Sequence, residues 1–94
     1  MKHNIAIVGA TGAVGRKMLE TLVLRKFPFK KIILLASKKS DGKIINFNGF
    51  EYTVKSLDNF NFQDADIAFF SAGSKVSEIY APLAEKNNCF VIDN

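Results

Sequence analysis

Three glycines spaced three residues apart are the feature of this sequence most suggestive of chemistry. Gly9, Gly12 and Gly15 follow the short apolar run 5–8 and precede a stretch with helical periodicity. A strand, a glycine turn and a helix N-terminus together make a phosphate site, because the amides of the first helical turn and the helix dipole favour an anion. The sequence therefore predicts that this turn binds a phosphate.

Each residue of the turn has an expected role. Gly9 lets the chain leave the strand at backbone angles that a side chain resists. Gly12 keeps a Cβ away from an approaching pyrophosphate, and Gly15 lets the new helix pack closely on the sheet. Thr11 adds a hydroxyl donor. The spacing is G-x-x-G-x-x-G rather than the commoner G-x-G-x-x-G, so the strand-then-helix context carries the interpretation, and the alternative is a βα turn without a ligand.

Basic and hydroxyl side chains follow the second predicted strand, 31–36, where dinucleotide-binding folds contact the adenosine ribose. An acid there would accept from the ribose 2′-hydroxyl and repel a 2′-phosphate. This chain instead has Ser37, Lys39 and Ser40, which suit a 2′-phosphate. Asp41 lies beyond the first contact positions. The sequence predicts NADP rather than NAD, and the alternative is a solvated basic loop.

A second loop of small residues, Ser71, Ala72 and Gly73, lies between a buried strand and a helix, as the glycine turn does. Parallel strands present their carboxyl ends to the ligand, so these residues leave room for the nicotinamide ribose or the adjoining phosphate. The alternative is that Ser74 or Ser77 simply caps the helix.

The order of elements predicts a Rossmann-like, doubly wound α/β fold with a mostly parallel sheet. The dipeptide Asn48-Gly49 indicates a β-hairpin inserted at the edge of this sheet. Val76, Ile79, Tyr80, Leu83 and Ala84 are expected to face the sheet, and the nine phenylalanines to lie mostly in the core. The predicted strands are 5–8, 31–36, 44–47, 50–54, 67–70 and 90–92, the predicted helices are 14–24 and 75–86, and 57–62 is irregular.

Catalytic groups are missing from this pattern. His3 and Cys89 are the only histidine and cysteine. Both fall at the amino edge of the predicted sheet, so we expect Cys89 in the core and His3 at a solvated terminus. Asp93 ends the last strand at the ligand edge, where it could orient a loop. No residue is a candidate for catalysis, and no cluster is a candidate for a metal.

Size and composition limit the classes of protein. The 94 residues suffice for one domain, and a hydrophobic content of 48% provides a core. The net charge of +4 comes without a basic stripe interleaved with aromatics, so nucleic acid is not an expected partner. One cysteine fits a reducing compartment. Neither a signal-peptide pattern nor an apolar run of ~20 residues is found, so we expect a cytoplasmic protein without a membrane partner.

Taken together, these segments resemble the start of bacterial aspartate-semialdehyde dehydrogenases. The resemblance covers the whole chain. It implies that Thr11, Gly12, Ala13 and Val14 hold the cofactor pyrophosphate, that Ser37, Lys39 and Ser40 hold the 2′-phosphate, and that 71–73 line the nicotinamide side. The family usually has arginine where this chain has Lys39. Lysine keeps the positive charge but lacks the planar guanidinium group, which can donate two parallel hydrogen bonds. Five segments carry the resemblance, in this order along the chain: 9–15, then 35–37 together with Lys39, Ser40 and Gly42, then 70–73, 80–82 and 91–94.

The resemblance also implies a reaction, the reduction of L-4-aspartyl phosphate to L-aspartate 4-semialdehyde with NADPH and release of phosphate. This step belongs to the biosynthesis of lysine through diaminopimelate, and of threonine and methionine. In that family a cysteine forms a thioester with the acyl group and a histidine handles protons. Those residues and the substrate-binding arginines lie after Asn94, so none can be assigned here.

We therefore expect residues 1–94 to be the N-terminal NADP-binding domain of a longer enzyme, truncated before the catalytic and dimerisation domain. The full-length enzyme is expected to be a homodimer acting on a small-molecule substrate. The alternatives are another NADP-dependent acyl-phosphate reductase, a non-catalytic NADP-sensing module, and an isolated domain without cofactor affinity.

Overall fold

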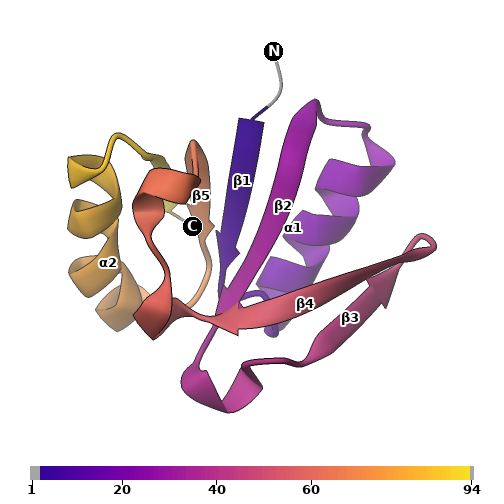
Figure 1. Cartoon of the computed structure of the whole chain (residues 1–94), viewed down its shortest axis with the longest axis horizontal. Coiled ribbons are helices and arrows are strands. Elements are labelled where there is room, and N and C mark those ends of the chain that lie inside the picture. The colour runs from indigo at the N-terminus through magenta and orange to yellow at the C-terminus, as the bar shows by residue number, and fades with distance from the viewer. Residues whose placement is uncertain (1–2, 94) are drawn as a thin grey trace.

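A six-stranded sheet carries one α-helix on each face (Figure 1). The computed structural model describes residues 3–93. The elements are β1 (His3–Val8), α1 (Ala13–Leu24), β2 (Phe29–Ala36), β3 (Ile44–Phe47), β4 (Phe50–Ser56), β5 (Ile67–Phe70), α2 (Ser74–Lys86) and β6 (Phe90–Asp93), with short 3₁₀ helices η1 (Lys38–Ser40), η2 (Leu57–Asn59) and η3 (Phe62–Asp64).

The strand order is β3-β4-β2-β1-β5-β6. Every neighbouring pair is parallel except β3 and β4, which form the predicted hairpin at one edge. Asn48 and Gly49 make its turn with φ of +53° and +83°. The mostly parallel, doubly wound sheet with an edge hairpin is thus confirmed. Because the other five strands run in one direction, the loops that follow them meet at a single carboxyl edge.

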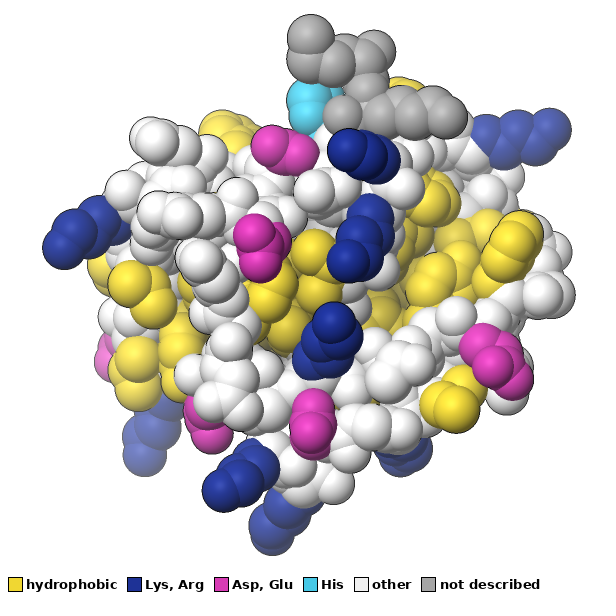
Figure 2. Space-filling model, in the orientation of Figure 1, with side chains coloured by type: hydrophobic (Ala, Val, Ile, Leu, Met, Phe, Trp, Pro, Cys, Tyr) yellow, Lys and Arg dark blue, Asp and Glu magenta, His cyan; other side chains and the backbone are white. Residues whose placement is uncertain are grey.

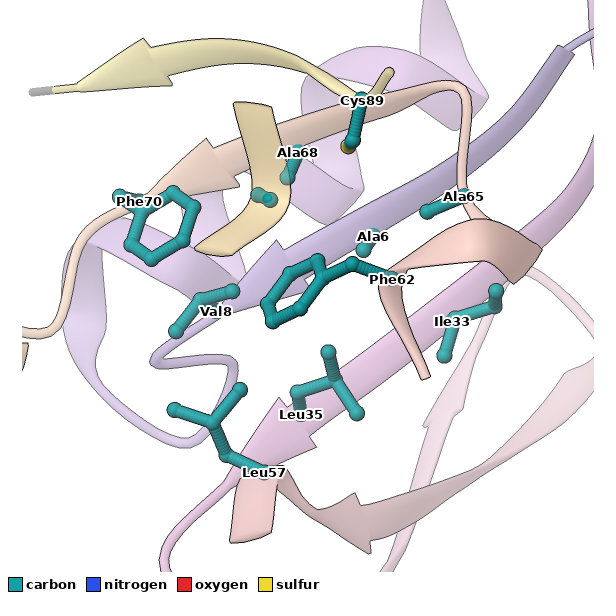
Figure 3. Close-up of a cluster of buried hydrophobic side chains, with 11 residues drawn as sticks. Ala6, Val8, Ile33, Leu35, Leu57, Phe62, Ala65, Ala68, Phe70 and Cys89 are labelled. Carbon is teal, nitrogen blue, oxygen red and sulfur yellow. The ribbon is translucent and has the colours of Figure 1, made fainter. Parts of the chain in front are cut away.

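Two apolar clusters hold the layers together. On one face, Leu19 and Leu22 of α1 pack against alternate residues of the central strands, including Ile7, and the hairpin adds Ile45. On the other face, Phe62 is 1% exposed, and its ring lies stacked with that of Phe70 at 6.2 Å between centroids. Figure 3 shows Phe62 pointing from η3 into the second cluster, so a short 3₁₀ turn covers this part of the sheet beside α2.

The packing face of α2 differs from the expectation at two positions. Val76, Tyr80 and Ala84 contact the sheet cluster as predicted. Ile79 and Leu83, however, are 66% and 43% exposed. Residues spaced four apart follow one another along a helix face, so the row from 76 to 84 defines the buried stripe and 79 and 83 fall on its outer flank.

The phenylalanines divide between core and surface. Six are buried or partly packed, but Phe27, Phe50 and Phe90 are exposed. Phe90 pairs with Ile67 and Ile92 with Phe69, which places both β6 residues on the same face of the sheet as α1. Phe90 is 65% and Ile92 is 39% exposed. The sheet face that carries α1 is therefore left open over β6.

Candidate functional site

The turn after β1 packs directly on the loop after β5. Gly9 has φ of +91°, the left-handed conformation that glycine adopts freely. A Cβ on Gly9 would lie 2.9 Å from the carbonyl carbon and oxygen of Ser71. Its amide donates to the Leu35 carbonyl at 2.9 Å, which ties the turn to β2. Gly9 therefore has the predicted role, and it also joins two of the predicted ligand loops.

The next glycine opens the helix N-terminus to solvent. Gly12 is the N-cap of α1, and a Cβ there would meet only the Gly9 oxygen at 3.6 Å. The first intrahelical bond runs from the Arg16 amide to Gly12, so the amides of 13–15 have no intrahelical acceptor. The first turn contains no acid, and 11–14 are exposed. Free amides, an open approach and the absence of negative charge fit a bound phosphate.

Gly15 contacts a different partner from the one expected. The sequence suggested close packing of the helix on the sheet. In the structure, a Cβ on Gly15 would lie 2.9 Å from both the Gly9 carbonyl carbon and the Ala10 Cα. Gly15 therefore lets α1 approach the glycine turn itself, because the helix starts only four residues after Gly9.

A cleft of 460 Å³ lies at the carboxyl edge and brings these loops together. It includes six of the predicted site residues, namely Gly9, Thr11, Gly12, Ser37, Ser71 and Ala72. The other five, Ala13, Val14, Lys39, Ser40 and Gly73, continue from these along the chain but do not line the cleft. The remaining lining residues are Val8, Ala36, Leu57, Asp58, Val76 and Tyr80.

The loop after β2 forms the 3₁₀ turn η1. Ser37 and Lys39 are exposed, and Lys39 makes no ion pair within residues 3–93. The Asp41 carboxylate is engaged elsewhere, because its Oδ1 accepts the Ser56 amide of β4 at 2.9 Å. The loop thus presents a free ammonium group and hydroxyls next to the glycine turn, while its one acid fastens the loop to β4.

The loop after β5 contradicts the helix-cap alternative. The N-cap of α2 is Gly73, with φ of +96° and no side-chain cap. Ser74 is the first helical residue, and the Ser77 hydroxyl donates instead to Asp93 Oδ1 at 3.1 Å. The Ser71 hydroxyl donates to the Val8 carbonyl at 3.0 Å. Neither Ser74 nor Ser77 caps the helix, and Asp93 fastens the end of β6 to α2.

Sequence reasoning missed the wall of the cleft that η2 and α2 contribute. The Tyr80 hydroxyl donates to Asp58 Oδ1 at 3.1 Å. Burial, followed by the hydrogen bond to Asp58 and its negative charge, raises the pKa of Tyr80 above its ordinary value. The segment 57–62 lacks any periodicity, so the sequence carried no signal for this pairing.

Cys89 occupies the amino edge, as expected. It is 2% exposed and belongs to the cluster beneath α2. Burial and the nearby Asp66 raise the pKa of its thiol to about 11. β1 begins at His3, so this residue opens the strand rather than preceding it.

A second groove, larger than this cleft, lies on the face of the sheet that carries α2 and η3. It measures 780 Å³, lies over β2, β4 and η3, and includes Lys31, Lys55 and Asp64. Figure 2 shows a row of basic side chains down the middle of this face, beside apolar and acidic ones. Only Asp41 and Gly42, at the end of the loop after β2, reach this groove, and it includes none of the predicted site residues. The smaller cleft is therefore the better candidate for a dinucleotide.

Comparison with known proteins decides the family. Residues 4–94 match the family described as semialdehyde dehydrogenase, NAD binding domain. The chain belongs to this family. The semialdehyde dehydrogenase NAD-binding domains bind a nicotinamide dinucleotide, in agreement with the cleft. Within residues 3–93, no helix is long and apolar enough to cross a membrane.

Several relatives are named aspartate-semialdehyde dehydrogenase. The protein of Rickettsia bellii is 50% identical over 92 residues, which cover 98% of this chain and 27% of that protein. That of Aquifex aeolicus is 50% identical over 95 residues, covering 100% and 28%. The structure of aspartate semialdehyde dehydrogenase II from Vibrio cholerae, complexed with ASA, has a TM-score of 0.95 and 46% identity, and covers 100% of this chain and 31% of that one. The chain thus spans under a third of the length of these relatives.

Proposed function

We propose that this chain is the NADP-binding domain of an aspartate-semialdehyde dehydrogenase. The observation that carries the proposal is the convergence of three loops on one cleft, since Gly9, Ser37 and Ser71 all line it. Its size and its place at the carboxyl ends of parallel strands are those of a nucleotide site. The glycine turn would hold the pyrophosphate through the amides of 13–15 and the Thr11 hydroxyl.

The preference for NADP over NAD rests on the loop after β2. Ser37 lines the cleft, and Lys39 follows it with a free ammonium group. The only acid in this loop is Asp41, whose Oδ1 is occupied by the Ser56 amide. A 2′-phosphate at this loop would therefore meet a cation and two hydroxyls, from Ser37 and Ser40, while the Asp41 carboxylate is bonded to the Ser56 amide of β4.

The nicotinamide half belongs on the other side of the glycine turn. Ser71 and Ala72 line the cleft there, and Gly73 continues the loop. The bound cofactor would supply the hydride, while this chain orients it. The amide and hydroxyl of Ser71 both donate to Val8, which leaves the hydroxyl oxygen free to accept.

The activity of the whole protein follows from the relatives. We propose that it reduces L-4-aspartyl phosphate to L-aspartate 4-semialdehyde as a cytoplasmic homodimer, with catalytic groups from a further domain. A further domain packed on the α1 face of the sheet would cover Phe90 and Ile92, the two exposed apolar side chains on that face of β6.

A chimera tests this proposal. Residues 1–94 would replace the matching N-terminal segment of the Vibrio cholerae enzyme, and reduction of NADP by aspartate semialdehyde and phosphate would be followed at 340 nm. The proposal predicts an active chimera. A chimera that folds, shown by circular dichroism and a cooperative melt, but lacks this activity would contradict it. The parent enzyme serves as the control.

A further inference from the structure

A hydrogen bond between two side chains forms one wall of the cleft. Tyr80 on α2 donates its hydroxyl to Asp58 Oδ1 on η2 at 3.1 Å, across 22 positions of sequence. Both residues line the cleft, between the apolar side chains of Leu57 and Val76. Neither residue lies in the glycine turn, the η1 loop or the loop after β5.

The strand order places Asp58 on one particular side of the cleft. Asp58 follows β4, Ser37 follows β2, the glycine turn follows β1 and Ser71 follows β5. Because β4 and β2 are neighbours, the strand end before Asp58 adjoins the strand end before Ser37, and both residues line the cleft. A dinucleotide with its pyrophosphate at the glycine turn and its 2′-phosphate near Ser37 places its adenine beside Asp58.

The chemistry of a carboxylate narrows what Asp58 can contact. An ionised carboxylate only accepts hydrogen bonds, and it repels phosphate groups. Tyr80 satisfies Oδ1, and no hydrogen bond to Oδ2 occurs within residues 3–93. On the adenosine half of NADP, the base contributes one donor group, the exocyclic amine of adenine. Leu57 and Val76 supply apolar surface for a flat ring.

We propose that Asp58, oriented by Tyr80, accepts a hydrogen bond from the exocyclic amine of adenine and so selects adenine over a 6-oxopurine. The inference rests on the proposed cofactor site and names the specificity residue within it. Tyr80 is a positioning residue, because it acts through Asp58. A tyrosine with a raised pKa keeps its proton at neutral pH, so the hydroxyl remains a donor to the carboxylate.

The test compares NADP with its hypoxanthine analogue, in which a carbonyl oxygen replaces the amine. Calorimetric titration of the 94-residue chain should give a Kd for NADP about tenfold below that for the analogue, as for the loss of one hydrogen bond to a charged group. In Asp58→Asn, the amide can donate to the carbonyl oxygen and still accept from Tyr80. The ratio of the two Kd values should fall to about one.

Two further variants separate positioning from charge. Tyr80→Phe removes the hydroxyl that orients the carboxylate, and we expect the Kd ratio to fall about threefold while NADP still binds. Asp64→Asn removes an exposed acid that lines the larger groove instead of the cleft. It should leave the ratio unchanged, because the base lies elsewhere.

The outcomes distinguish this inference from the proposed function. If the wild-type chain binds NADP and the hypoxanthine analogue equally, the assignment of Asp58 is wrong while the cofactor site stands. If Asp58→Asn gives the same ratio of Kd values as the wild-type chain, the assignment of Asp58 is also wrong while the cofactor site stands. If the wild-type chain binds neither molecule, the proposed function itself fails.

Discussion

Gly15 lies against Gly9 so closely that a Cβ on Gly15 would be 2.9 Å from the Gly9 carbonyl carbon. This contact between backbones joins α1 to the turn that ends β1. It determines where the helix N-terminus points, and therefore where a phosphate can bind. The two outer glycines of the motif are thus packing residues, and the middle glycine faces the open cleft.

Replacing Gly15 by alanine should destabilise the fold. The new Cβ would press on backbone atoms of Gly9 and Ala10 that cannot move without displacing the turn. We expect a loss of about 1–3 kcal/mol of unfolding free energy, measured by urea denaturation. Gly12→Ala is the matched control, since its Cβ meets only one atom, at 3.6 Å, and should cost well under 1 kcal/mol. Equal losses in both variants would contradict the packing role of Gly15.

Gly12→Val should abolish dinucleotide binding without unfolding the chain. Gly12 has φ of −83°, which valine tolerates, and the added methyl groups would project into open space where the pyrophosphate approaches. Circular dichroism and the melting curve should match those of the wild type, while titration with NADPH shows no binding. Retained NADPH affinity in this variant would remove the glycine turn from the site.

Lys39→Ala should weaken NADPH binding much more than NADH binding. Lys39 is exposed, without an ion-pair partner in residues 3–93, so its charge is available to a 2′-phosphate. We expect the NADPH affinity to fall about tenfold, and the effect to shrink at high salt. Lys30→Ala, an exposed lysine of β2 that lies far from its carboxyl end, is the control. Equal losses for both cofactors would place the 2′-phosphate elsewhere.

The buried thiol predicts a loss of stability at high pH. Burial raises the pKa of Cys89 to about 11, from an ordinary value of 9.0. Between these values the unfolded chain releases a proton that the folded chain keeps, so the unfolding free energy falls as pH rises. We would measure the unfolding free energy by urea denaturation at pH 8 and at pH 10.5. Between these two pH values the unfolding free energy of Cys89→Ala should fall less than that of the wild type, because the variant has no thiol to ionise. The same slope in both proteins would show that the thiol ionises equally in the two states.

Phe62 is expected to be a large contributor to stability. It is 1% exposed, and it comes from η3, a turn whose cover over the sheet depends on this ring. Phe62→Ala should cost about 3–5 kcal/mol by urea denaturation. Phe50→Ala, at 64% exposure on the hairpin, should change stability by no more than ~0.5 kcal/mol. A small effect at Phe62 would mean that the second cluster does not depend on η3.

The mostly parallel sheet and the carboxyl-edge loops followed from local signals in the sequence. The apolar run before Gly9, the Asn48-Gly49 dipeptide and the alternation of strands with helices each report on neighbouring residues alone. These signals predicted the sheet, the edge hairpin and the two loops at Ser37 and Ser71 that line the cleft. They also predicted the helix bounds to within one residue at each N-terminus.

The remaining features depend on contacts that no local pattern records. Ile79 and Leu83 fit the helical period, but the buried stripe is set by where the sheet lies, so they are exposed. Asp58 and Tyr80 lie 22 positions apart and meet because η2 and α2 pack on the same face of the sheet. Ser77 resembled a cap by its position near the helix start, yet Asp93 of β6 takes its hydroxyl.

Paired titrations of the 94-residue chain with NADPH and with NADH test the central claim most directly. Three loops converge on the cleft, and the one after β2 offers Lys39 and hydroxyls, while its acid, Asp41, accepts the Ser56 amide. The account therefore predicts saturable NADPH binding with a Kd at least about tenfold below that for NADH. Equal affinity for the two cofactors, or no binding of either one to the folded chain, would contradict it.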